Sequence, residues 1–408
     1  MCMTLKTIPT HQVTLGMHIH ALNGAWIDHP FWKSKFVIED PDDLKKLKSS
    51  SIKEVIIDIS KGVDVKESIS QQPVETPPEP APEPEPPSVP QIPAKVQRVS
   101  AAEERVHAKK ILQSSKKAVT SMLNDARLGK AVDASVAHNL VDDITSSVSR
   151  NESALISLVR LKTKDDYTYM HSVAVCALMI ALAKELGLNE TETKQAGLAG
   201  LLHDIGKAGI PLEVLNKPGA LTDDEFALVK LHPERGHAML MQAHILDEVV
   251  LDVCLHHHEK VNGQGYPHKL AADKISLFAK MGAVCDVYDA VTSNRPYKAG
   301  WEPGLSLHRM AQWEGHFDDT VFKAFVRSIG IYPIGSMVKL KSGRLAVVID
   351  QSEKSLLTPV VKVFFSTKAK ARIPVDTLDL SKPNANDSIA SHEDPAAWGI
   401  HNAHEIWA

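Results

Sequence analysis

Cysteine is scarce in this chain of 408 residues, and long apolar runs and an excess of basic charge are missing. The four cysteines (Cys2, Cys176, Cys254 and Cys285) form no Cys-x-x-Cys pair, which excludes a disulfide scaffold and disfavours a zinc knuckle. The longest unbroken apolar run spans eleven residues, 173–183, and is too short to cross a bilayer. The N-terminus lacks the apolar stretch of a signal peptide. We therefore expect a cytoplasmic protein without a membrane span.

The balance of charge argues against nucleic acid as the main partner. Lys and Arg number 46 and Asp and Glu number 50, so the formal net charge is −4. A protein that binds mainly through duplex phosphates would usually be basic, and no basic stripe is present here, so we expect no DNA binding. Histidine, in contrast, is abundant, with 20 residues whose positions need an explanation.

Composition divides the N-terminal part of the chain into a module and a linker. Residues 1–66 are predicted to form a small α/β module, with a helix at 40–47 and a strand at 53–60. Residues 67–97 are a Pro/Glu-rich linker, since ten prolines lie between positions 73 and 93. We interpret this linker as a semi-rigid acidic spacer with polyproline II character; the alternative is a ligand for a proline-binding domain.

The remainder is predicted to be mostly helical. Residues 98–160 carry apolar stripes at helical spacing, which predict helices that either pack on the next domain or form a dimerising stalk. Residues 161–330 are predicted to form an all-helical domain interrupted by three loops. Residues 331–382 are β-rich, and residues 383–408 are predicted to be a tail without a strong signal. Strands are expected at 336–340, 345–349 and 360–365. The fold class is therefore mostly α, with a small α/β module before the main domain and a short β-rich segment after it.

Histidine and carboxylate side chains recur beside the loops of the helical domain. They are His171, the adjacent pair His203 and Asp204, His232, the run from His256 to Glu259, and Asp286. Imidazole and carboxylate are the ligand set of first-row divalent metals. Neighbours on a helix are about 100° apart, so an adjacent His-Asp pair faces one site from a helix end or from a close-packed helix. Its Asp can then give one oxygen to each of two metals. The combination indicates a metal site.

Five motifs contain these residues. They are Tyr-Thr-Tyr-Met-His-Ser at 167–172, Gly-Leu-Leu-His-Asp-Ile-Gly-Lys at 200–207, Leu-His-Pro at 231–233, His-His-Glu-Lys-Val-Asn-Gly-Gln-Gly-Tyr-Pro at 257–267, and Asp-Val-Tyr-Asp-Ala-Val-Thr-Ser-Asn-Arg-Pro-Tyr-Lys at 286–298. Together they resemble the HD-GYP domain, a branch of the HD phosphohydrolase superfamily, over 161 to about 305. The first 66 residues more weakly resemble the small module that precedes this domain in many bacterial members.

The resemblance implies a bacterial signalling enzyme. It would hydrolyse the second messenger cyclic di-GMP to linear pGpG, or onward to GMP. Two divalent transition metals, iron or manganese, would activate the attacking hydroxide. The rival hypothesis is a binding or scaffold module that binds the messenger, or docks diguanylate cyclases through the exposed loop Gly263–Pro267. A nucleotide monophosphatase would share the His-Asp core without needing the Gly-Tyr-Pro loop.

The resemblance also implies a role for each matched residue. The metal ligands would be His171, His203, Asp204, His232, His257, His258 and Asp286, with Asp204 bridging. Asp204 and Lys207 would be the catalytic residues, the ammonium of Lys207 meeting the scissile phosphate and assisting the leaving oxygen. The substrate shell would be Lys207, Tyr266, Asp289, Arg295 and Lys298. Asp289 would accept from a guanine edge or orient Arg295, and His256 would support the ligands from behind.

Two positions depart from the family pattern. Some members have a glutamate four residues before the first histidine that supports a third metal; Tyr167 stands there, which predicts a two-metal site. Two-metal sites are thought to favour stopping at pGpG. Asn262 stands where the family usually has Asp in its Asp-Gly-x-Gly-Tyr-Pro loop. Asn keeps the ability to cap a turn and removes a charge, so its effect depends on whether that charge matters.

Overall fold

The structure of the chain is a computed structural model. It describes residues 5–23, 36–38, 40–48, 53–63, 98–160, 167–217, 219–293, 300–352, 355–400 and 404–407. These residues fall into two compact units, Met1–Pro90 and Gln91–Ala408. The predicted linker at 67–97 lies outside the described residues.

The first unit contains an antiparallel sheet in the order β1-β4-β2-β3. Its elements are β1 (Leu5–Pro9), η1 (Thr10–Gln12), β2 (His18–Asn23), β3 (Phe36–Val37), α1 (Pro41–Lys48) and β4 (Glu54–Asp58). The predicted helix at 40–47 and strand at 53–60 are confirmed by α1 and β4. Val55 and Ile57 alternate into a small core with Ile19 and Leu47, as one buried face of a sheet requires.

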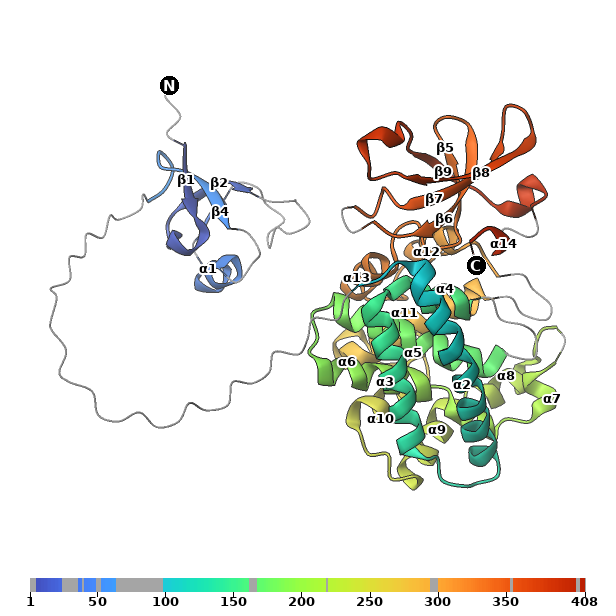
Figure 1. Cartoon of the computed structure of the whole chain (residues 1–408). Coiled ribbons are helices and arrows are strands. Elements are labelled where there is room, and N and C mark those ends of the chain that lie inside the picture. The colour runs from blue at the N-terminus through green and yellow to red at the C-terminus, as the bar shows by residue number, and fades with distance from the viewer. Residues whose placement is uncertain are drawn as a thin grey trace, which may run out of the picture. The chain divides into compact units, whose positions relative to one another are not determined.

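The second unit is built from helices (Figure 1). They are α2 (Ala101–Arg127), α3 (Ala134–Arg150), α4 (Glu152–Val159), α5 (Tyr167–Glu185), α6 (Glu190–Leu202), η4 (Ile205–Gly209), α7 (Leu212–Leu215), α8 (Asp223–Val229), α9 (His232–Gln242), α10 (Glu248–His256), η5 (Ala272–Lys274), α11 (Leu277–Thr292), α12 (Pro303–Ala311) and α13 (Asp319–Ile329). The mostly helical fold class is confirmed. No helix in the described ranges combines the length and the apolar character needed to cross a membrane.

Helix α5 is the centre of this unit. Residues 173–183, the longest apolar run of the sequence, are each at most 2% exposed. Neighbouring helices, among them α2, α3, α4, α6, α11 and α13, pack around it. A helix that is apolar on every face belongs in the core of a large domain, which explains the run without a membrane. Near the start of this central helix, His171 lies close to His203, Asp204 and Asp286.

Helices α2, α3 and α4 pack on the main helical domain, as one of the two interpretations of residues 98–160 expected. Glu104 of α2 is fully buried and bonds Arg150 of α3 at 2.6 and 2.8 Å, while Ser147 donates to it at 2.7 Å. Ser100 and Glu103 form a reciprocal capping box that begins α2. Because their apolar stripes are buried within the chain, these helices do not need a second copy to cover them.

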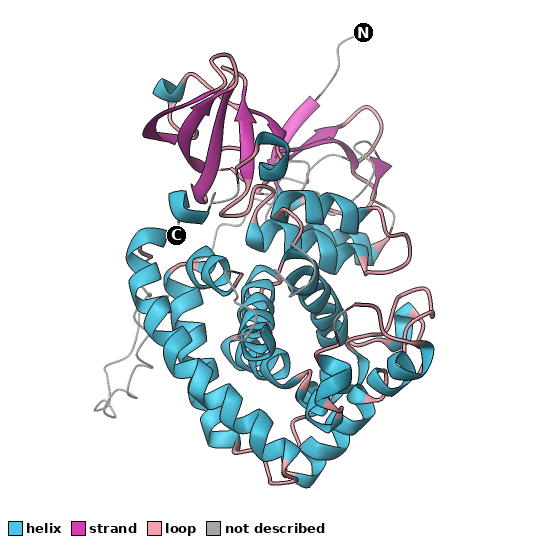
Figure 2. Cartoon of the chain, turned by 90° about the vertical axis from the view of Figure 1, so that its right-hand side faces the viewer, coloured by secondary structure: helices cyan, strands magenta, loops and turns pink. Residues whose placement is uncertain are grey.

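A five-stranded antiparallel sheet in the order β8-β7-β6-β5-β9 lies at one end of these helices (Figures 1 and 2). Its elements are β5 (Met337–Leu340), β6 (Arg344–Asp350), β7 (Val360–Ser366), β8 (Ala371–Asp379), η6 (Pro383–Ala385), β9 (Ile389–His392), η7 (Pro395–Trp398) and α14 (His404–Trp407). The three predicted strands are confirmed. The predicted tail is wrong, because β9 pairs with β5 and Trp407 is buried against the sheet.

Candidate metal centre

The predicted ligands come from five helical segments that meet at one place. His171 lies in α5, and His203 and Asp204 link the end of α6 to η4. His232 begins α9, His257 and His258 follow α10, and Asp286 lies in α11. Helix ends and their immediate neighbours supply most of the set. This confirms the expectation that an adjacent His-Asp pair can face one site from a helix end.

A glycine allows two of these segments to approach each other. A Cβ on Gly206 would lie 1.9 Å from the carbonyl oxygen of His232 and 2.5 Å from the backbone nitrogen of Gly236. Only a residue without a side chain fits between η4 and α9 at this distance. The glycine of the His-Asp-x-Gly-Lys motif is thus explained by packing, and it brings Asp204 within reach of His232.

The candidate ligands form two groups that share Asp204. One group is Asp204, His232, His257 and His258; the other is His171, His203, Asp204 and Asp286. Within each group the nitrogen and oxygen atoms that could bind a metal lie within 4.8 Å of one another. Asp204 Oδ1 lies 3.2 Å from His232 Nε2, and Asp204 Oδ2 lies 3.2 Å from His171 Nε2. The two oxygens of one carboxylate therefore face different groups, as a bridging ligand requires.

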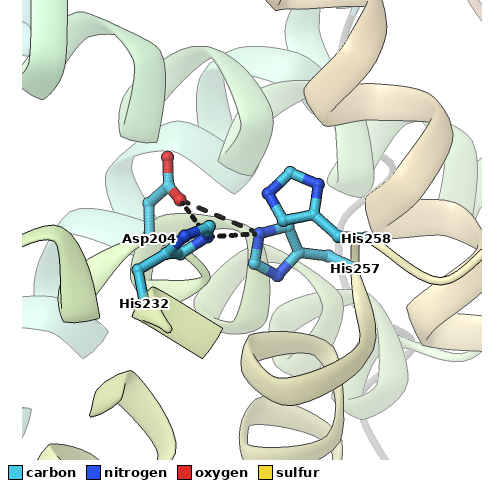
Figure 3. Close-up of side chains that lie close together, drawn as sticks. All are labelled: Asp204, His232, His257 and His258. Carbon is cyan, nitrogen blue, oxygen red and sulfur yellow. Dashed lines mark hydrogen bonds and ion pairs between the residues drawn. The ribbon is translucent and has the colours of Figure 1, made fainter. Parts of the chain in front are cut away.

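The protonation of the imidazoles fits metal binding. In His203, His232 and His257, Nδ1 donates to a backbone carbonyl three or four residues earlier, at 2.7 to 3.0 Å. This bond leaves the inward Nε2 of each ring as a bare lone pair. His232 Nε2 and His257 Nε2 lie only 3.3 Å apart, and a dashed line joins the two rings in Figure 3. Two lone pairs facing each other repel, and a cation between them removes the conflict.

Burial supports the same conclusion. His203 Nε2 and Asp204 Oδ1 are buried atoms without a hydrogen-bond partner among the described residues. Such atoms cost free energy unless a bound group satisfies them. The residues present therefore fit divalent cations, and the donor set of imidazole nitrogens and carboxylate oxygens matches first-row transition metals.

The pKa shifts of Asp204, Asp286 and His258 favour the forms of these three side chains that bind metal. Burial raises the pKa of Asp204, but Lys207 and His203 outweigh it and hold that pKa well below its ordinary value. The pKa of Asp286 is also well below its ordinary value, because the neighbouring side chains of His171 and His203 outweigh the effect of burial. Burial lowers the pKa of His258 to about 3 against the opposing charge of Asp286. The carboxylates are thus charged and His258 is neutral.

Asp289 is a buried carboxylate that contacts the candidate ligand His171. Its Oδ2 is 2.6 Å from His171 Nδ1, its Oδ1 accepts from Ser293 at 3.3 Å, and the residue is 1% exposed. Burial lowers the pKa of His171, but hydrogen bonds to Asp204, Asp286 and Asp289 raise it well above its ordinary value. The bond to Asp289 fixes the orientation of His171. The expected contact of Asp289 with a guanine edge and its alternative role of orienting Arg295 both stay predictions, because Arg295 lies outside the described residues.

The predicted substrate residues divide into two sets. Lys207 Nζ lies 2.5 Å from Asp204 Oδ2, and its side chain is 27% exposed, so it stands at the edge of the centre. The ring of Tyr266 stacks on His258, with centroids 4.6 Å apart, and burial raises the pKa of its phenol. Arg295, Lys298 and the side chain of Tyr167 lie outside the described residues.

The Gly-Tyr-Pro loop is held by Glu259, which the sequence places at the end of the histidine run but to which we assigned no role. Glu259 is 2% exposed and accepts from the backbone nitrogens of His268 at 2.7 Å and Leu270 at 3.0 Å. Its place directly after the paired histidines was the available signal. Asn262 Oδ1 accepts from the backbone nitrogen of Gln264 at 3.0 Å, which is the turn-capping role that Asn shares with Asp.

His256 does not support the ligands as expected. Its Nδ1 is 2.7 Å from Asp252 Oδ1, and its Nε2 is 3.0 Å from His268 Nδ1. Neither partner belongs to the two ligand groups. The three consecutive histidines therefore do not share one role. They lie at the end of α10, where successive side chains point in different directions, so His257 and His258 join the ligand group and His256 does not.

Comparisons with known proteins agree with this architecture. Residues 139–321 match the family described as HD domain, and residues 5–137 match a domain of unknown function, DUF3391. A cyclic di-GMP phosphodiesterase of Pseudomonas aeruginosa is 51% identical over 404 residues, which cover 99% of this chain and 95% of that relative. A cyclic di-GMP phosphodiesterase response regulator of Xanthomonas campestris is 40% identical over 148 residues, 36% of this chain and 39% of that protein.

Two further comparisons cover parts of the chain. A 3′3′-cGAMP-specific phosphodiesterase of Vibrio cholerae is 36% identical over 167 residues, 40% of this chain and 38% of that protein. Among solved structures, a protein of Bdellovibrio bacteriovorus described as an HDG"Y"P protein superposes with a TM-score of 0.46 at 17% identity, covering 79% of this chain and 98% of that one. The near full-length relative, the HD domain match and the five motifs show that the chain belongs to the HD-GYP family of HD domain proteins.

Proposed function

We propose that this chain is a cyclic di-GMP phosphodiesterase whose two-metal centre cleaves the messenger to pGpG. The observation that carries the proposal is the pair of ligand groups that share the Asp204 carboxylate. The relative that matches nearly the whole chain is named for the same activity. We assign the ligand roles to the seven residues of these groups, and iron or manganese to the two positions. As a member of a messenger-degrading pathway, the enzyme would act in the cytoplasm.

Two bound cations would supply Lewis-acid activation of water and of the phosphodiester. The protein would provide the rest. Asp204 would hold both positions through separate oxygens. Asp289 would accept a hydrogen bond from Nδ1 of His171, which leaves Nε2 of that ring facing the centre as a lone pair. Lys207, already paired with Asp204 Oδ2, would place its ammonium against the developing charge and donate from Nζ to the leaving oxygen.

The test is turnover of cyclic di-GMP by the full chain, loaded anaerobically with Fe(II) or Mn(II), with the products separated. The double variant His203→Ala, Asp204→Ala should lose turnover and most of its metal while keeping its helical spectrum. His256→Ala is the matched control, because this histidine neighbours the ligands but bonds Asp252 and His268 instead. Full turnover by the double variant would contradict the assigned site.

The rival hypothesis is a scaffold that docks diguanylate cyclases through the loop Gly263–Pro267. This loop follows the candidate ligands His257 and His258 closely in the sequence. A chain that binds cyclic di-GMP but hydrolyses it with neither metal would favour that hypothesis. The same experiment resolves the product, since pGpG and GMP separate readily. Formation of a homodimer stays a prediction, and light scattering of the full chain would measure it.

A further inference from the structure

An aromatic and cationic cluster lies next to the metal centre and has no role in holding it. Its members are Phe226 in α8, Lys230 directly after α8, and Tyr266 of the Gly-Tyr-Pro loop. The ammonium of Lys230 lies 4.4 Å from the centroid of the Phe226 ring and 5.8 Å from that of the Tyr266 ring. We call these three residues the base ledge.

The base ledge is joined to the metal centre through one ring. Tyr266 stacks on His258 with an interplanar angle of 27° and lies 6.5 Å, centroid to centroid, from His232. Both histidines are members of the same ligand group. A nucleotide whose phosphate meets this centre would therefore place a base within reach of Tyr266 and the side chains beyond it.

Two properties of the base ledge favour a ligand over internal packing. Phe226 is 46% exposed, so part of its side chain is open to solvent. Lys230 has no carboxylate within ion-pair distance among the residues that the structure describes, although lysines nearby, such as Lys217 with Glu225 at 2.6 Å, are paired. The backbone of Lys230 is fixed by its hydrogen bond to the carbonyl of Phe226 at 3.0 Å. The ammonium is thus positioned, and its donors are available to an acceptor.

We propose that Phe226, Lys230 and Tyr266 form a guanine-selective base site of the phosphodiesterase, a step that rests on the proposed function. Aromatic faces stack on any base, because every base has a π-face. A lysine ammonium donates to guanine O6 and N7, whereas adenine places an amino group at the position of O6. Lys230 therefore favours guanine over adenine. A preference for guanine would help to distinguish cyclic di-GMP from other cyclic dinucleotides, and one relative of this chain is a 3′3′-cGAMP-specific phosphodiesterase.

The test compares cyclic di-GMP with cyclic di-AMP, which carries adenine at both positions. Binding to the full chain is measured by calorimetry after chelator treatment, and kcat and KM are measured after metal loading. Lys230→Met should weaken binding of cyclic di-GMP by about tenfold and raise its KM. Binding of cyclic di-AMP should change less than twofold. Phe226→Ala should weaken both ligands by a similar factor, because stacking does not distinguish the bases.

The control is Lys274→Met, because the Lys274 side chain is 71% exposed and its ammonium lies 3.9 Å from Asp273. This variant should behave as the wild type does. Metal content and melting temperature should be unchanged in all three variants, which separates a base site from a packing role. Equal losses for the two dinucleotides in Lys230→Met, or no loss, would overturn the base site.

Failure of the proposed function gives a different pattern. A wild-type chain that binds cyclic di-GMP without hydrolysing it would overturn the proposed phosphodiesterase activity. The loss of affinity in Lys230→Met for cyclic di-GMP, compared with that for cyclic di-AMP, would still test the base site. A wild-type chain that neither binds nor hydrolyses cyclic di-GMP would overturn both proposals.

Discussion

Replacing Asp289 by alanine should weaken metal binding without touching a metal ligand. The Asp289 carboxylate bonds His171 Nδ1 at 2.6 Å, and the exposed fractions of the two side chains are 1% and 5%. A buried hydrogen bond to a charged group is worth about 1.5–3 kcal/mol. Because about 1.4 kcal/mol corresponds to a factor of ten, we expect a loss of about 10- to 100-fold in the affinity of the centre beside His171.

The assay is competition with a chromogenic chelator, with metals counted on the same samples. Asp289→Asn keeps an oxygen that can accept from Nδ1, so its loss should be smaller than that of Asp289→Ala. Asp252→Ala is a matched control, because Asp252 bonds His256 Nδ1 at a similar 2.7 Å but lies outside the ligand groups. Unchanged metal affinity in Asp289→Ala, or an equal loss in Asp252→Ala, would refute the reasoning.

Two further predictions concern stability and the Gly-Tyr-Pro loop. Glu104→Gln should lower the free energy of unfolding by about 1–3 kcal/mol in urea titrations, since it weakens the charge-assisted bonds from Arg150. Bonds from Arg150 hold the pKa of Glu104 below its ordinary value of 4.5 despite burial. The difference in the free energy of unfolding between the wild type and Glu104→Gln should therefore be largest above pH 4.5 and should shrink as the pH falls below it. If this difference in the free energy of unfolding did not change with pH, the stabilising role of the Glu104–Arg150 ion pair would be contradicted. Asn262→Asp should leave kcat/KM for cyclic di-GMP within about threefold, because either side chain can accept from the backbone nitrogen of Gln264. A tenfold gain in kcat/KM would show that the negative charge of the Asp usual in the family contributes to catalysis.

The candidate metal centre was predictable in part, because histidine and carboxylate recur beside the loops and the five motifs resemble a known family. His203 and Asp204 are adjacent, and this alone restricts them to a helix end or a close-packed helix, so their place between α6 and η4 follows. The run of histidines was less informative, since sequence gives no direction for side chains where a helix ends. The different surroundings of His256 and His257 depend on the final turn of α10.

Other features depend on tertiary contacts that a sequence does not display. Asp289 is separated by 118 residues from the histidine that it orients, so its role is visible only once α5 and α11 are packed together. Strand β8 was missed because most of its side chains are exposed, and an edge strand of this kind lacks the alternation that marks a half-buried strand. Strand β9 has only four residues and is defined by its pairing with β5.

The central claim is that one carboxylate, Asp204, joins two metal positions in an active phosphodiesterase. Anomalous diffraction from crystals of the Mn(II)-loaded chain, taken from a preparation that hydrolyses cyclic di-GMP, tests it most directly. We predict two manganese peaks, one beside each oxygen of Asp204, with His232 and His257 on one side and His171 and His203 on the other. A single peak, or peaks away from Asp204, would contradict the account.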